Sequence, residues 1–371
     1  MSKKVDFIFP LFCGLLAYIV YELTNAQGLF WGDGGEFIAA SSTLGIGHAY
    51  GHPLFWLVGR ISIMLSPSNP AAGMNHLVAL FSAGSCFVIT LLAQNWVNDK
   101  FSRIQKMIAI FTAVGIYAVA PTVWSQASYV EVYNFQAFFL ALAVYFLDRY
   151  FFRKGNNLNL FASAYFFGIA VTLGLYALLL AILPLAMWVV TKRKFNLKIF
   201  LLSAIFFIVG LSLWLYLPIR SAIKPIYYHW EKINSLTALL KYLSRKSYSN
   251  EVHVGFIGIP FTFTKTLKLL FANIGMWGIV LLIFSGWSII SDKKERIAAP
   301  YFFSALFLTL AFILTIPFNL TLIQMTEIGV YFIPVFLLCI PLFIIGINNC
   351  LLYTSDAADE LDGVDLGGRR I

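Results

Sequence analysis

Four ionisable side chains, Asp33, Glu36, His48 and His52, lie within residues 31–54 (WGDGGEFIAASSTLGIGHAYGHPL), directly after the first apolar segment of the chain. Carboxylates and imidazoles of this kind serve acid–base catalysis or bind metal ions. The chain is 60% hydrophobic, and ionisable groups beside a membrane-spanning segment are few, costly and usually functional. We therefore look for the functional site in this stretch first.

Asp33 and Glu36 belong to a glycine-rich turn, residues 32–36, that opens an amphipathic stretch over 37–44. An acid at the start of a helix also caps it, and Glu36 follows Asp33 at the spacing of a capping box. Local sequence therefore predicts two roles, a helix cap and a catalytic pair, and the two can coexist.

His48 and His52 have the i, i+4 spacing at which two imidazoles on a helix can bind one metal ion. Gly51 and Pro53 argue against a regular helix here, so a metal site is not predicted from this pair. We expect His48 to hydrogen-bond back to the acidic turn. We expect His52 to be an ordinary side chain at the membrane interface.

Other candidate groups lie at the ends of apolar segments. Residues 53–65 are predicted to form a helix in the membrane interface, with Trp56 as an anchor and Arg60 available to lipid phosphate. Glu131 either caps a helix N-terminus or joins the site. For Arg220, just past a span, snorkelling to the interface and recognition of a phosphate both remain open.

The composition identifies the class of protein. A mean hydropathy of +0.81 with only 12% charged residues excludes a soluble domain, and repeated apolar runs of about 17 to 25 residues are typical of membrane-spanning helices. Cys13, Cys86 and Cys339 lie inside such runs without CxxC spacing and are expected to be packing residues. The predicted fold is all-α, a polytopic integral membrane protein with about ten transmembrane helices. The predicted spans are 5–23, 71–96, 107–123, 133–152, 158–174, 177–191, 198–217, 264–289, 299–317 and 328–347.

Short basic connections set the predicted orientation. The positive-inside rule assigns them, with the N-terminus, to the cytoplasm. This requires residues 158–191 to cross the bilayer twice with a tight turn near Gly174, whereas a single long tilted helix would invert everything after it. The two large loops, 24–70 and 218–262, then share the extracytoplasmic face with nearly every candidate group. The basic connections lie at 100–106, 149–154, 192–198 and 293–296.

From Cys350 onward the chain changes abruptly to an Asp- and Gly-rich tail without periodicity, CLLYTSDAADELDGVDLGGRRI. The string CLLYTS resembles the translation of a transposase adapter end used in sequencing libraries. We interpret residues 350–371 as a sequencing-adapter artefact that replaces the natural C-terminus, against the alternative of a genuine acidic cytoplasmic tail. Without it, the transmembrane domain 1–349 has a formal charge of +12 instead of +9.

Several segments in order carry a resemblance to a known family. They are WxDxGE at 31–36, His-x-x-Gly-x-Pro-Leu at 48–54, WSQASYVEVY at 124–133, YLPIRS at 216–221, Trp230, and SRKSY at 244–248. In these motifs the chain is similar to a bacterial multispanning family of unknown function. That family is related to the eukaryotic endoplasmic-reticulum O-mannosyltransferase of plexin and MET-type receptors, within the GT-C glycosyltransferases. Ala49-Tyr50 replace the family's usual Pro-Pro, and Tyr176 follows Gly-Leu where the family often has histidine.

The resemblance implies an inverting glycosyltransferase of the bacterial inner membrane. It would transfer a sugar, with mannose as one candidate, from a polyprenyl-phosphate donor to a protein or glycan acceptor on the extracytoplasmic side. A divalent metal is the one cofactor that the resemblance leaves open, because metal-dependent GT-C members hold an ion with an acid of this kind. The partners implied are donor, acceptor and bilayer, and not nucleic acid. The implied roles are catalysis for Asp33 (general base) and Glu36, support for His48 and Glu131, and donor-phosphate binding for Arg220, Arg245 and Lys246.

A second class of protein fits the same groups. A transporter or lipid-binding membrane protein without chemistry would line a polar route with such acids and arginines. The two halves of the chain show no inverted repeat, and the candidate groups gather at one interface instead of the bilayer midplane, which favours the enzyme. A degenerate, inactive family member would have the same sequence features.

Overall fold

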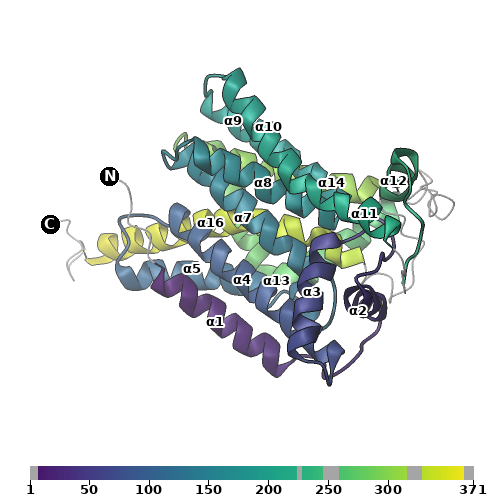
Figure 1. Cartoon of the computed structure of the whole chain (residues 1–371). Coiled ribbons are helices and arrows are strands. Elements are labelled where there is room, and N and C mark those ends of the chain that lie inside the picture. Colours follow the sequence, from purple (N-terminus) through teal and green to yellow (C-terminus); the bar gives the residue numbers. More distant parts are fainter. Residues whose placement is uncertain (1–6, 224–227, 245–258, 316–327, 363–371) are drawn as a thin grey trace.

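A computed structural model describes residues 7–223, 228–244, 259–315 and 328–362. This part of the chain is a bundle of α-helices without a named strand (Figure 1). Its β-type pairing is an isolated bridge between Ile46 and His229. The predicted all-α class is confirmed.

The helices follow the predicted apolar segments closely. The helices in the predicted spans are α1 (Ile8–Leu23), α4 (Pro70–Trp96), α5 (Arg103–Ala118), α7 (Tyr133–Phe152), α8 (Asn157–Leu173), α9 (Ile182–Thr191), α10 (Leu197–Leu211), α13 (Ile259–Ser291), α14 (Ala299–Thr315) and α16 (Ile333–Asp362). The other helices are α2 (Gly34–Thr43), α3 (Pro53–Leu65), α6 (Pro121–Ala127), α11 (Tyr216–Ala222) and α12 (Leu236–Leu243). A 3₁₀ helix, η1 (Leu175–Ala181), leads into α9.

Among the described residues, six helices are long and apolar enough to cross a bilayer, and α5 with α6 would make a seventh. The protein is therefore a multi-pass membrane protein, but the count of about ten spans is not confirmed. The apolar helices α1, α3 and α8 and the segment Leu175–Thr191 have only 10–17 residues, fewer than the roughly 20 that a perpendicular span needs.

The predicted continuous span 107–123 is wrong. α5 ends at Ala118 and α6 begins at Pro121, and the two helices meet at an angle of 69°. Proline has no backbone N–H to donate and is well suited to the first position of a helix, so it starts a new helix here instead of continuing the old one.

The predicted chain reversal near Gly174 is confirmed. Gln136, at the start of α7, donates its Nε2 to the Gly174 carbonyl at 3.0 Å. Arg193, just after α9, donates to the carbonyl of Tyr150 near the end of α7 at 2.5 Å. The turn at Gly174 and the basic link after α9 therefore lie at opposite ends of α7, as the two-crossing arrangement requires.

The centre of the bundle is formed by α4 and α16, and α2, α3, α11 and α12 gather at one end of it (Figure 1). In the most apolar 18-residue stretch of Val330–Leu351, which includes the start of α16, 94% is buried inside the protein. The corresponding share is 6% in the span Leu197–Ala222, which contains α10. The free cysteines Cys13, Cys86 and Cys339 are all buried, which confirms them as packing residues. That residues 350–371 are foreign sequence stays a prediction.

α3 forms over the predicted range, but the prediction that Trp56 is an interfacial anchor is wrong. Its side chain is completely buried, with ring centroids 6.2 Å from His52 and 5.9 Å from Tyr216. Arg60 donates Nη1 to the Ser42 carbonyl at 2.6 Å and so ties α3 to the end of α2. α3 therefore packs against α2, next to the candidate site.

Candidate active site

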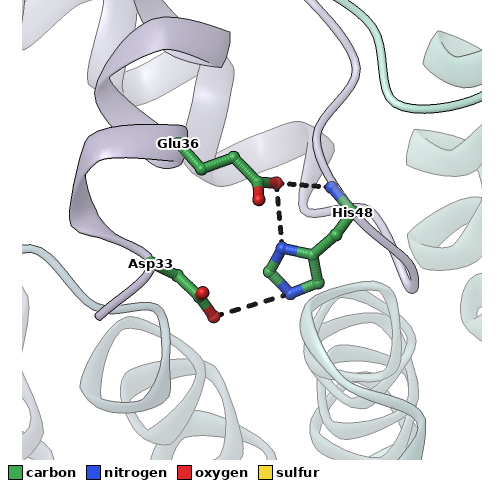
Figure 2. Close-up of side chains that lie close together, drawn as sticks. All are labelled: Asp33, Glu36 and His48. Carbon is green, nitrogen blue, oxygen red and sulfur yellow. Dashed lines mark hydrogen bonds and ion pairs between the residues drawn. The ribbon is translucent and has the colours of Figure 1, made fainter. Parts of the chain in front are cut away.

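Asp33, Glu36 and His48 converge at the start of α2 (Figure 2). Oε1 of Glu36 accepts a hydrogen bond from the His48 backbone N–H at 2.5 Å and lies 2.8 Å from His48 Nδ1. Because a carboxylate only accepts, Nδ1 carries the proton, and Nε2 lies on the other side of the ring, 3.7 Å from Asp33 Oδ2. The prediction that His48 bonds back to the acidic turn is confirmed.

The capping alternative for the two acids is contradicted. Asp33 occupies the N-cap position of α2, but its side chain accepts no capping hydrogen bond. Glu36 uses Oε1 for His48 instead of reaching back to the N-cap amide, so the capping box does not form. The Asp33 side chain remains 52% exposed, whereas those of Glu36 and His48 are only 13% and 12% exposed. Asp33 is thus the accessible member of the cluster.

Glu131, from the connection between α6 and α7, is brought into the same place. Its Oε1 accepts a hydrogen bond from the Asp33 backbone N–H at 3.3 Å, while the residue as a whole is buried. Gly32 makes this approach feasible, because a Cβ there would lie 2.9 Å from the Glu131 carboxylate and its φ of +99° is strained for other residues. Glu131 therefore joins the site.

The loop 44–48, which we call the site loop, presents His48, and residues of α11 and of the second large loop hold it. Tyr216 donates its hydroxyl to the Gly45 carbonyl at 2.9 Å. Tyr242 donates to the Gly47 carbonyl at 2.6 Å and approaches the His48 carbonyl at 2.8 Å. Neither tyrosine was predicted as a site residue from the sequence, although Tyr216 is the first residue of the YLPIRS motif.

Main-chain pairing reinforces this hold. The Ile46 backbone N–H donates to the Tyr228 carbonyl at 3.0 Å, and the Trp230 N–H donates to the Ile46 carbonyl at 2.8 Å. The Trp230 side chain is 50% exposed, with its ring centroid 6.4 Å from that of His48. The site loop is therefore fixed by backbone and side-chain bonds from residues far away in the chain.

Arg220 also binds the site loop. It donates Nε to the Leu44 carbonyl and Nη2 to the Thr43 carbonyl at 3.0 Å. The last carbonyls of a helix lack partners within the helix, and α2 ends here, so the guanidinium satisfies its C-terminus. Neither interpretation made from the sequence included this contact. Arg245 and Lys246 lie outside the described residues, and their predicted phosphate role stays a prediction.

His52 does not belong to the open part of the site, and the prediction of an interfacial side chain is wrong. It is buried at 4% exposure, with ring centroids 5.4 Å from Phe37 and 5.6 Å from His48. It packs behind His48 as part of the aromatic floor of the site.

The cluster is compatible with a divalent cation. One ligand atom from each of Asp33, Glu36 and His48 can be chosen so that all three lie within 4.8 Å of one another. Two carboxylates and an imidazole are a donor set that zinc and other first-row metals accept.

Residues 33–199 match the family model described as the Protein O-mannosyl-transferase TMEM260 N-terminal domain. The resemblance to the O-mannosyltransferase family is confirmed. Protein O-mannosyl-transferase tmem260 of Dictyostelium discoideum is 24% identical over 317 residues, covering 78% of this chain and 38% of that protein. TMEM260 of Mus musculus is 26% identical over 239 residues, covering 62% of this chain and 33% of that protein. The matches thus span only 33–38% of the length of these TMEM260 relatives.

The structure of ArnT from Cupriavidus metallidurans bound to undecaprenyl phosphate has a similar fold. The TM-score is 0.64 with 13% sequence identity, over 91% of this chain and 59% of ArnT. This likeness confirms the GT-C fold. The TMEM260-like region, 33–199, contains Asp33, Glu36, His48 and Glu131. The residues that hold the site loop, Tyr216 to Tyr242, come after it.

Proposed function

We propose that the protein is an inverting membrane glycosyltransferase that transfers a sugar from a polyprenyl-phosphate donor to a hydroxyl group of an extracytoplasmic acceptor. The observation that carries this proposal is the half-exposed carboxylate of Asp33 beside His48, whose ring is oriented by Glu36. An exposed base backed by an oriented partner is the arrangement that general-base catalysis needs.

The chemistry follows from a single displacement. The acceptor oxygen attacks the anomeric carbon, the bond from that carbon to the phosphate oxygen breaks, and the lipid phosphate leaves. The acceptor proton passes to the Asp33 carboxylate. Glu36 holds His48 with Nε2 toward Asp33, so that His48 supports the carboxylate as its charge changes.

The nature of the substrates is inferred from the relatives. Both TMEM260 proteins are named protein O-mannosyl-transferases, which supports mannose as the sugar and a protein as the acceptor. ArnT is bound to undecaprenyl phosphate, which supports a polyprenyl-phosphate donor. A lipid-linked donor also suits a helical bundle whose polar site lies at one end, since the prenyl chain stays in the bilayer while the sugar reaches the interface. Arg220, with Arg245 and Lys246, is our candidate for the donor phosphate.

A polar route through the bundle, as in a transporter, has less support. Asp33, Glu36, His48 and Glu131 gather at the start of α2. Figure 1 shows that α2 lies at one end of the bundle and not at its middle. The decisive experiment is incubation of the purified full-length protein with polyprenyl-phosphate mannose and an acceptor peptide rich in serine and threonine, followed by measurement of product mass. A mass increase of one hexose on the peptide is expected. Absence of any product with several polyprenyl-phosphate sugars would contradict the proposal.

The proposed site is extracytoplasmic, because the basic links lie at the opposite end of the bundle and the positive-inside rule places them in the cytoplasm. Single cysteines placed at Lys100, Lys154 and Lys294 should therefore resist an impermeant thiol reagent added outside intact cells, while a cysteine at Asn234 should react. Labelling of both sets from outside would contradict this orientation.

A further inference from the structure

An apolar crevice of about 430 Å³ lies between α7, α8, the segment 175–191 and α10. It forms because α10 packs along α8 while α9 packs against α14 and α7, so two helices joined by a short link have different partners. Figure 1 shows α9 and α10 at the edge of the bundle. On α7 (Tyr133–Phe152) the crevice is lined by Ala143, Val144 and Leu147, which lie nearer to the end with the basic links than to the end at Gln136.

The walls of this crevice are suited to hydrocarbon. Leu183, Phe200 and Phe207 contribute to them, and the polar side chains in the lining are Ser163 and Ser203. Both serine hydroxyls donate to main-chain carbonyls of their own surroundings, Ala143 and Ile199, each at 2.8 Å. With its hydroxyls bonded to the main chain, the lining resembles the apolar cavities that stay dry and bind apolar molecules.

Positive charge lies in and beside the link between α9 and α10, two helices that line the crevice. Lys192, Lys194 and Lys198 are exposed, and no carboxylate in the described part of the chain forms an ion pair with them. Lys198 precedes the crevice residue Phe200 by two positions. Arg193, between the lysines, is used differently, because its guanidinium lies 3.8 Å from the centroid of the Tyr150 ring. The three lysines are therefore available to an anion beside the crevice.

The same link has the composition of a membrane–water interface. Trp188 is 43% exposed and Phe195 is 62% exposed, on either side of Lys192 and Lys194. Exposed aromatic rings next to lysines are typical of the headgroup level of a bilayer. A crevice that begins at this level and continues along α10 lies at the depth of lipid acyl chains.

We propose that this crevice binds one anionic phospholipid of the leaflet at the basic end, with an acyl chain in the crevice and its phosphate at Lys192, Lys194 and Lys198. Charge complementarity favours an anionic headgroup, because a basic cluster at a membrane surface attracts anionic lipids. The glycosyl donor is a different occupant, because its phosphate must reach Asp33 at the other end of the bundle.

Native mass spectrometry of the delipidated full-length protein, with phosphatidylglycerol or phosphatidylcholine added back, tests the proposal. Phosphatidylglycerol should bind at least tenfold more tightly than phosphatidylcholine. The triple variant Lys192→Gln, Lys194→Gln, Lys198→Gln should lose this preference, and Ala204→Trp, which fills the crevice, should weaken both lipids. Lys100→Gln, Arg103→Gln, Lys106→Gln is the matched control, because it removes three charges at the same end, at the start of α5 and in the turn before it, neither of which lines the crevice.

Three results would overturn the proposal. The control triple variant could lower phosphatidylglycerol binding as much as the first triple variant, which would mean unspecific surface attraction. Folded Ala204→Trp, with unchanged helicity by circular dichroism, could bind as well as the wild type, which would place the chain elsewhere. Polyprenyl phosphate could displace phosphatidylglycerol competitively, which would assign the crevice to the donor.

Discussion

Two clusters at opposite ends of the bundle are each built on an aspartate, and they differ in how fully the acid is bound. Asp148, at the basic end, is completely buried. Its Oδ1 accepts hydrogen bonds from Trp96 Nε1 at 2.9 Å and from the Tyr301 hydroxyl at 3.0 Å, and its Oδ2 accepts one from Asn95 at 2.9 Å. Arg153 adds a charge 3.7 Å away and stacks over the Trp96 ring at 5.0 Å.

Asp33, at the other end, is half exposed. Among the described residues, its ion-pair contact is with His48, whose Nε2 lies 3.7 Å from Asp33 Oδ2. The Asp148 cluster joins α4, α7 and α14 through one buried acid, so its bonds serve the packing of the bundle. The Asp33 cluster keeps an accessible carboxylate on a well-held loop. The comparison teaches that the presence of an acid says less than the hydrogen bonds that its oxygens accept. Those bonds separate a structural acid from one that is available for chemistry.

The strongest test of this contrast is Asp33→Asn. Asn has almost the same size, and the Asp33 side chain makes no capping hydrogen bond that the change could break, so the fold should be kept. Loss of a positioned general base should lower transfer by about 10²- to 10⁴-fold. Turnover is measured with the hexose-transfer assay, and thermal unfolding in detergent confirms folding. Glu36→Gln is the milder companion, because its amide oxygen can still accept from His48.

Near-normal turnover in Asp33→Asn would contradict the assignment of Asp33 as base. The search would then move to Glu131, which lies within hydrogen-bonding distance of the Asp33 backbone.

Asp148→Ala should have the opposite profile. Removal of this acid leaves Trp96, Tyr301 and Asn95 without their acceptor and Arg153 without its counter-ion. Breaking a buried charged network of this kind typically costs about 3 kcal/mol or more of the free energy of unfolding. Thermal unfolding followed by tryptophan fluorescence should show a clear decrease in midpoint, while activity per folded molecule stays near that of the wild type. A stable Asp148→Ala with low turnover would reverse the roles assigned to the two clusters.

Much of the fold could be predicted from the sequence, because apolar runs mark helices directly. The predicted span 71–96 became α4, Pro70–Trp96, and the turn near Gly174 was found at its predicted position. The contact of His48 with the acidic turn was also predicted, since only a dozen residues separate the partners. Local patterns carry this information.

The parts that failed depend on contacts between distant segments. Tyr242 reaches the His48 carbonyl across 194 positions in the chain, and its target is a main-chain oxygen that has no signature in the sequence. The interfacial predictions for Trp56 and His52 failed because an amphipathic helix shows which face is apolar but not which loops cover it. The Asp148 cluster did have a signal, a lone acid within an apolar span, which usually marks a buried polar network.

Arg220 gives the smallest but most discriminating prediction. Its guanidinium binds two carbonyls at the end of α2 and is also our candidate for the donor phosphate. Arg220→Lys keeps the charge but loses the planar fork of donors, so a phosphate role predicts a several-fold increase in the donor KM with little change in kcat. A purely positioning role predicts the reverse, a lower kcat at unchanged donor KM, because the site loop and His48 would be less well fixed. Kinetics with varied donor concentration separate the two, and Arg60→Lys, which alters the neighbouring bond to Ser42, is the matched control for general loosening of α2.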